Sequence, residues 1–143
     1  MSSELKVRNR PALQSSVSVP LKLAIWPRNP VSQITRKFGF KIPGVRPELI
    51  QPMGIEFTND GKLAFVAIGR ANRLAVVDTA TYEVKDFILI GQRPWHMALS
   101  PDGKKLYTAN GLTNDMTVVD VESLKAERSV PVGRLPWGVA IKP

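Results

Sequence analysis

The sequence predicts an all-β fold, and three observations support that prediction. The body of the chain repeats itself at an interval of 42 residues. Each repeat holds four short runs of apolar and β-branched residues, separated by Gly, Pro, Asn and Asp. These runs lack the spacing of three and four residues that a helical repeat requires. Four short antiparallel strands per repeat are typical of a propeller blade, so we expect a partial β-propeller: about two complete four-stranded antiparallel blades plus parts of flanking blades.

The repeat is clearest in its prolines, because Pro52, Pro94 and Pro136 stand 42 residues apart. Residues 51–92 align with residues 93–134 without a gap, and about a quarter of the aligned positions are identical. A third copy begins at Leu135. The predicted organisation is therefore a blade over 51–92, a second blade over 93–134, and the first strand of a next blade over 135–143.

Strands are predicted wherever apolar runs lie between turn residues. In the first copy they cover residues 53–58, 63–68, 74–78 and 84–90, and in the second copy residues 95–100, 106–110, 116–120 and 125–132. The pairs Asp60-Gly61 and Asp102-Gly103 predict turns, because Gly accepts a positive φ and Asp bonds the backbone that follows it.

The N-terminal third of the chain carries the net charge. Residues 1–46 hold nine Lys or Arg and one acidic residue, whereas residues 47–143 hold eleven of each, and the formal net charge is +8. Prolines are frequent here, so we expect residues 1–35 to be a basic, poorly ordered segment and residues 36–50 to form the last strand of a preceding blade and a connector. The sequence shows no recognisable signal peptide and no apolar run long enough to span a membrane.

Few residues are available for catalysis or for metal binding. The sequence has no Cys and a single His, which excludes thiol chemistry and sites rich in Cys or His. Asp60, Asp78, Asp102 and Asp120 recur at turns in both copies, so turn formation explains them better than acid–base catalysis does. We therefore predict no catalytic residues, no cofactor and no metal.

One end of the predicted blades is richer in Arg and Asn, and we expect any ligand or partner to bind there. Trp95 and Trp137 hold a fixed repeat position, which favours packing between blades over stacking on a quinone or sugar. The lone His suits packing or channel lining better than ligation of haem or metal. The candidate face comprises Arg70, Asn72, Arg93, His96, Asn110, Asn114 and Arg134.

Several motifs resemble a known repeat family. Residues 94–110, PWHMALSPDGKKLYTAN, resemble the YVTN-type β-propeller repeat, with YTAN at the position of the name-giving motif and FVAI at residues 65–68 as a weaker copy. Residues 44–48 (GVRPE), 81–84 (TYEV) and 133–143 (GRLPWGVAIKP) resemble the C-terminal part of propeller proteins associated with pyrroloquinoline quinone (PQQ)-dependent alcohol catabolism.

The resemblance implies a non-catalytic, periplasmic β-propeller that binds or scaffolds a quinoprotein dehydrogenase or a cytochrome. This chain holds fewer blades than the family's seven and looks truncated, so open blade faces are expected to drive self-association. We expect no nucleic acid at the propeller. Two alternatives are a lactonase-like seven-bladed propeller hydrolase and a truncated gene product without a function of its own.

Overall fold

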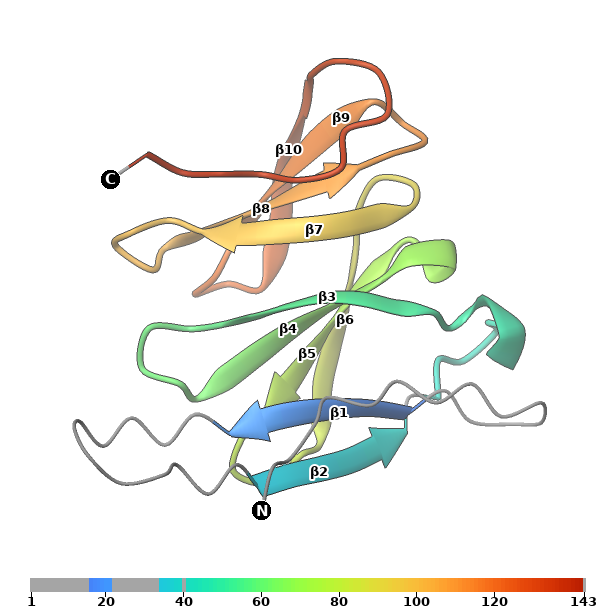
Figure 1. Ribbon diagram of the computed structural model, residues 1–143, viewed down its shortest axis with the longest axis vertical. Coiled ribbons are helices and arrows are strands. Elements are labelled where there is room, and N and C mark those ends of the chain that lie inside the picture. Colours follow the sequence, from blue (N-terminus) through green and yellow to red (C-terminus); the bar gives the residue numbers. More distant parts are fainter. Residues whose placement is uncertain (1–15, 22–33, 40, 143) are drawn as a thin grey trace.

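The computed structural model describes residues 16–21, 34–39 and 41–142 of the chain, and these residues form β-sheets with almost no helix (Figure 1). Two four-stranded antiparallel sheets and one two-stranded sheet make up the fold. The predicted all-β class with propeller-like blades is confirmed. The two larger sheets are consecutive in the sequence, as the repeat requires.

Each four-stranded sheet is a simple meander in which every strand pairs with the next one along the chain. The first sheet consists of β3 (Pro52–Phe57), β4 (Leu63–Ile68), β5 (Arg73–Asp78) and β6 (Val84–Leu89). The second consists of β7 (Pro94–Leu99), β8 (Lys105–Asn110), β9 (Asp115–Asp120) and β10 (Lys125–Pro131). Both sheets carry an irregularity at the same place in the first strand, after Pro52 and after Pro94.

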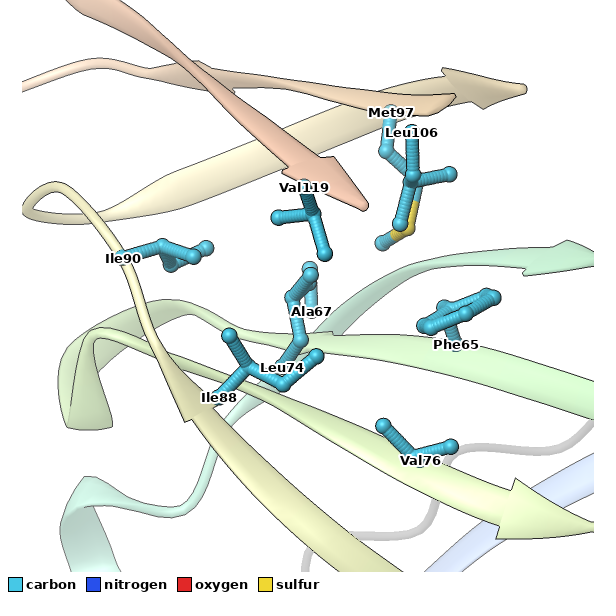
Figure 2. Packing of buried hydrophobic residues seen from close by; sticks show 9 residues of the cluster. All are labelled: Phe65, Ala67, Leu74, Val76, Ile88, Ile90, Met97, Leu106 and Val119. Carbon is cyan, nitrogen blue, oxygen red and sulfur yellow. The ribbon is translucent and has the colours of Figure 1, made fainter. Parts of the chain in front are cut away.

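One hydrophobic core lies between the two sheets (Figure 2). Side chains alternate between the faces of a strand, so every second residue of the first sheet faces the second sheet. Phe65 and Leu74 come from the first sheet, Met97 and Leu106 come from the second, and each is at most 1% exposed. Burying a side chain of this size contributes about 1.5–3 kcal/mol. The blades therefore stabilise each other by packing face to face.

A second core covers the opposite face of the first sheet. Ala64, Val66 and Ile68 pack there against Ile42 and Ile50, which precede β3. Residues 47–49, which form the short 3-10 helix η1 (Pro47–Leu49), lead into that strand. The first blade is therefore packed against apolar residues on both of its faces. The second blade is packed against the first blade on one face.

The ends of the chain differ from the sequence-based expectation. Strand β1 (Ser16–Leu21) pairs with β2 (Ile34–Gly39) as an antiparallel hairpin, so part of the segment 1–35 is regular although little regular structure was expected there. The rest of that segment lies outside the described residues. The strand predicted over 135–143 does not form among residues 135–142, because a strand needs a hydrogen-bonded neighbour and the described residues offer none to it.

Candidate functional site

The loops of the two blades gather at two opposite ends. At one end, called here the Asp-Gly end, lie the turns after β3, β5, β7 and β9. At the other, the arginine end, lie the connections after β4, β6, β8 and β10, including the 3-10 helix η2 (Gly69–Ala71). The sequence places the candidate face at the arginine end.

A groove of about 440 Å³ opens instead at the Asp-Gly end, between the turns of the two blades. Most of the lining residues have polar or charged side chains, and Leu63 and Val121 are the apolar ones. The lining residues are Thr58, Asn59, Asp60, Lys62, Leu63, Asp78, Lys85, Asp102, Gly103 and Val121. The 42-residue repeat predicts that the Asp-Gly turns lie side by side at one end, but the groove between them was not predicted from the sequence.

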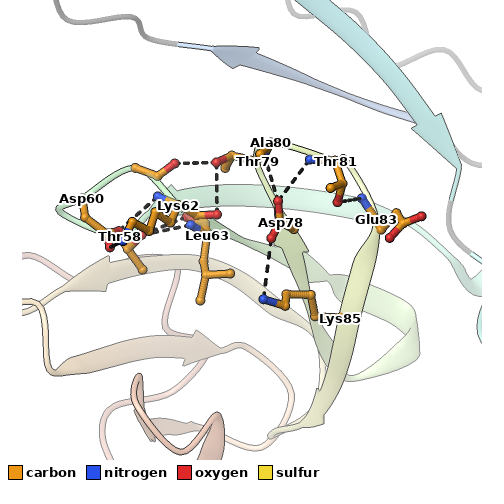
Figure 3. A network of polar contacts seen from close by, with 11 residues as sticks. Thr58, Asp60, Lys62, Leu63, Asp78, Thr79, Ala80, Thr81, Glu83 and Lys85 are labelled. Carbon is orange, nitrogen blue, oxygen red and sulfur yellow. Dashed lines mark hydrogen bonds and ion pairs between the residues drawn. The ribbon is translucent and has the colours of Figure 1, made fainter.

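Asp60 and Asp78, the two aspartates that the first blade contributes to the groove, are held by their own turns (Figure 3). The Asp60 carboxylate accepts hydrogen bonds from Thr58 Oγ1 at 2.6 Å and from the backbone N–H of Lys62 at 3.0 Å. In the next turn, Asp78 accepts the backbone N–H groups of Ala80 at 2.9 Å and Thr81 at 3.0 Å. These contacts explain why the aspartates recur in both repeats.

The same contacts fix the charge of the groove. The hydrogen bond from Thr58 lowers the pKa of Asp60, and the one from Ser100 lowers the pKa of Asp102. The backbone N–H groups of Thr81 and Ala80 likewise lower the pKa of Asp78. A carboxylate that stays ionised at neutral pH is a poor proton donor, so these residues suit turn formation and charge pairing better than general-acid catalysis.

Each blade has an ion pair at this end, but the lysine comes from a different strand. In the first blade, Lys85 of β6 lies 3.6 Å from Asp78. In the second blade, Lys105 of β8 lies 2.9 Å from Asp120 and also bonds Glu127. Glu127 stands where the first repeat has Lys85. The aspartate therefore keeps its place in both blades, while the lysine that pairs with it comes from β6 in the first blade and from β8 in the second.

At the arginine end, two tryptophans stack on each other. The ring centroids of Trp95 and Trp137 are 4.6 Å apart and the rings are inclined by 17°. The guanidinium carbon of Arg93 lies 4.9 Å from the Trp95 ring centroid. A Cβ added at Gly111 would stand 2.6 Å from Trp95 Nε1, so the absence of a side chain there gives the indole its place. Trp137 is 69% exposed.

The two candidate asparagines at this end are anchors for the chain that follows. Asn72 Oδ1 accepts the backbone N–H of Arg93 at 3.0 Å, and Asn114 Oδ1 accepts that of Leu135 at 2.8 Å. Both asparagines have a left-handed backbone, with φ of 55° and 56°, which Asn tolerates better than most residues. Each anchor holds the residue two positions before a tryptophan, so both tryptophans are positioned in the same way.

Asn110 is fully buried and does not belong to the exposed face. Its Nδ2 donates to Asp115 Oδ1 and to Thr117 Oγ1, both at 2.8 Å, and its Oδ1 accepts from Thr108. Thr117 Oγ1 in turn accepts the backbone N–H of Gly91. This polar cluster ties the connector between the blades to the second sheet.

His96 is exposed on β7, where the first repeat has Gly54 and the third has Gly138. A Cβ added at Gly138 would stand 3.9 Å from His96 Nδ1, so the imidazole lies beside the segment that follows β10. Burial raises the pKa of Glu56 on β3, and the neighbouring His96 opposes that shift. Among the described residues, no group of three or more His, Asp or Glu side chains could hold a metal ion.

The candidate face is therefore only partly a surface. Its three arginines and His96 are exposed, whereas Asn110 is buried and the other two asparagines anchor the backbone. Trp95 and Trp137 were expected to pack between blades; in the structure Trp95 of β7 stacks on Trp137, which lies in the segment after β10 and not in a strand. Within the ranges that the structure describes, no helix is long and apolar enough to cross a bilayer.

Comparisons with known proteins show the fold. No protein-family model and no curated protein matches the chain. The chain is similar to hydrazine synthase of Kuenenia stuttgartiensis, with 28% identity over 69% of this chain and a TM-score of 0.62. It is also similar to a functionally unknown protein from Desulfotomaculum acetoxidans, with 18% identity over 90% of this chain and a TM-score of 0.61. The WD40 repeats of RRP9 match 62% of it at 16% identity, with a TM-score of 0.55.

WD40 repeats form β-propellers, so these similarities agree with two propeller-like blades. The chain spans 29% of the hydrazine synthase chain, 42% of the Desulfotomaculum chain and 28% of the RRP9 chain. It thus corresponds to a minor part of each of these proteins.

Proposed function

We propose that this chain is a non-catalytic part of a β-propeller that acts by binding or scaffolding other proteins. The observation that supports this role is the fixed position of the aspartates at the Asp-Gly end. Asp60 and Asp102 are bonded within equivalent turns of the two blades, as repeat-wide structural residues would be. A catalytic pair would instead be confined to one repeat.

The resemblance of the repeat motifs extends the proposal to a biological setting. It suggests a Gram-negative periplasm and a partner that is a quinoprotein alcohol dehydrogenase or its cytochrome. The exposed arginines and Trp137 give such a partner a surface to bind, because Arg and Trp are enriched at the energetic centres of protein interfaces.

Co-purification tests this role against its alternatives. The full chain, expressed with an affinity tag in a Gram-negative periplasm, should retain a quinoprotein dehydrogenase or a cytochrome. Hydrolysis of lactones by the purified protein would instead support a lactonase-like hydrolase. Rapid loss of the protein from cells would support a gene product without a function of its own.

The outer face of the second blade supports a further part of the proposal, which is self-association. Tyr107 and Met116 are half-buried, whereas Phe65 and Leu74, their equivalents in the first blade, are fully buried against the second blade. The outer face thus repeats the residue pattern of an established blade–blade interface. We propose that a second copy of the chain covers it.

Light scattering during size-exclusion chromatography measures this self-association directly. We expect a dimer or larger assembly for the full chain, and a shift toward monomer for Met116→Glu, because a charge on this face opposes its burial. Lys125→Glu, at an exposed position of β10, is the control. A monomeric wild-type chain would reject self-association and leave the binding role to other partners.

A further inference from the structure

The arginine end carries positive charge that the described part of the chain does not neutralise. At the Asp-Gly end, Lys62, Lys85 and Lys105 each lie within 4 Å of a carboxylate. Among the described residues, no carboxylate forms an ion pair with Arg70, Arg93 or Arg134, and all three are exposed. Both ends hold basic residues, but among the described residues these three arginines carry positive charge that no ion pair neutralises.

The carboxylates of the arginine end are already engaged. Glu48 is paired with Arg46 at 3.3 Å. Asp115 accepts hydrogen bonds from Asn110 and from Thr113. An arginine presents a planar fork of donors that matches a carboxylate, and it is more weakly hydrated than a lysine. A carboxylate from another molecule would thus meet unpaired donors here.

An exposed aromatic face lies beside these donors. Arg93 is held over Trp95, and Trp95 is stacked on Trp137, so the charge and the two rings form one unit. The 69% exposure of Trp137 leaves much of its indole to contact an apolar side chain. The anchors at Asn72 and Asn114 fix the backbone of this unit, which lowers the entropic cost of binding.

We propose that this surface binds an acidic protein segment in which carboxylates flank an apolar or aromatic side chain. The carboxylates pair with Arg93 and Arg134, and the apolar side chain rests on Trp137. The inference deepens the proposed binding role and rests on it, since it names the chemistry of the partner. Its surface consists of Arg70, Arg93, Trp95, Arg134 and Trp137.

A nucleic acid fits this surface less well. Stacking on Trp137 would suit a single-stranded base, but binding of a phosphate backbone depends on a track of several basic contacts. Residues 47–143 hold as many acidic as basic residues, and the Asp-Gly end presents ionised aspartates. A short acidic segment needs only the few arginines that the arginine end provides.

The test uses the full chain and a fluorescent glutamate-rich peptide with a central phenylalanine, followed by fluorescence anisotropy. We expect binding that added salt weakens, and an affinity lowered about tenfold in Arg93→Gln/Arg134→Gln. Trp137→Ala should weaken binding by a similar factor. Lys62→Gln/Lys104→Gln removes the same charge from the Asp-Gly end and should bind as the wild type does, with the basic N-terminal segment unchanged in every variant.

Several outcomes would overturn the proposal. Equal binding by the arginine and the lysine variants would assign the peptide to the N-terminal segment. Equal binding of a peptide with glutamine in place of glutamate would remove the role of charge. Competition by a single-stranded oligonucleotide at similar strength would assign the surface to nucleic acid. A changed oligomeric state in Trp137→Ala, with peptide binding intact, would assign Trp137 to a second copy.

Failure of this inference and failure of the proposed function give different results. If Arg93→Gln/Arg134→Gln still co-purifies with the periplasmic partner, the scaffold role stands and the surface is elsewhere. If no partner co-purifies while the arginine and lysine variants still differ in their affinity for the peptide, the proposed surface stands and the periplasmic setting is wrong.

Discussion

The side-chain oxygen of Asn114 accepts the backbone N–H of Leu135 at 2.8 Å, and this contact fixes the segment that brings Trp137 onto Trp95. Asn72 and Arg93 make the same contact one repeat earlier. Asn114 O also accepts the backbone N–H of Val132, so one residue holds the segment through two bonds. The arrangement of the arginine end thus depends on a residue that carries no charge.

Replacing Asn114 should loosen the tryptophan stack. We expect Asn114→Ala to lower the free energy of unfolding by roughly 1–3 kcal/mol, because the variant loses a hydrogen bond and tolerates the left-handed backbone less well. Urea denaturation measures the loss. Near-ultraviolet circular dichroism should show a weaker signal from the stacked indoles.

Two further substitutions separate the loss of the hydrogen bond from the cost of the left-handed backbone. Asn114→Gly loses the hydrogen bond but accepts the left-handed backbone, so it should cost less than Asn114→Ala. Asn114→Asp keeps an acceptor oxygen and should preserve the indole signal. An alanine variant with wild-type stability and an unchanged indole signal would contradict the anchoring role.

The absence of a side chain at Gly111 is needed for Trp95. We expect Gly111→Ala to destabilise the protein by about 1–3 kcal/mol, because the new Cβ would lie 2.6 Å from Trp95 Nε1 and the indole must move. Gly133→Ala is the matched control, because nothing lies within 4 Å of its Cβ. Thermal unfolding compares the two, and equal melting temperatures would show that the indole lies elsewhere.

The buried cluster around Asn110 should be costly to disrupt. Asn110→Ala removes the hydrogen bonds from Asn110 Nδ2 to Asp115 and Thr117 and the acceptor of the buried Thr108 hydroxyl, so we expect a loss of about 1–3 kcal/mol in the free energy of unfolding. Asn59 Nδ2 donates to Pro101 O at an exposed position, so Asn59→Ala should change the free energy of unfolding by no more than about 0.5 kcal/mol. Urea denaturation measures the loss of stability in both variants. Equal losses in the two variants would contradict the prediction.

Acid should destabilise the protein through its turn aspartates. The ion pair with Lys105 lowers the pKa of Asp120 in the folded state. A lowered folded-state pKa gives stability that is present above the unfolded value, near 3.9, and is lost as the pH falls through the folded value. We therefore expect stability to decline below about pH 4, and Asp120→Asn to show a shallower decline in acid denaturation. An equally steep decline in the variant would contradict this assignment.

Much of the repeat could be predicted from the sequence. The runs at residues 63–68 and 84–90 predict β4 and β6 to within one residue, because alternation and β-branched composition follow directly from strand geometry. The turns at Asp60-Gly61 and Asp102-Gly103 are equally local, with positive φ at both glycines. Features that recur at an interval of 42 residues were predictable because each copy of the repeat supports the interpretation of the other.

Features that depend on long-range contacts were not predictable. Asn110 ends the strand predicted over residues 106–110 and was expected on the candidate face, whereas in the structure it is fully buried and bonded to Asp115 and Thr117. The groove depends on how two turns from different repeats face each other, which strand patterns do not specify. The segment 135–142 has the composition of a strand, but a strand also requires a partner.

A double-mutant cycle across the blade interface tests most directly whether the two repeats pack face to face. Phe65→Leu and Met97→Ala alter residues of one core cluster on different sheets. We expect a coupling free energy of about 0.5–3 kcal/mol between them, and additivity for Ile42→Val with Met97→Ala, because Ile42 belongs to the opposite core. Additivity in both cycles would show that Phe65 and Met97 are not energetically coupled, and it would contradict the face-to-face packing of the two repeats.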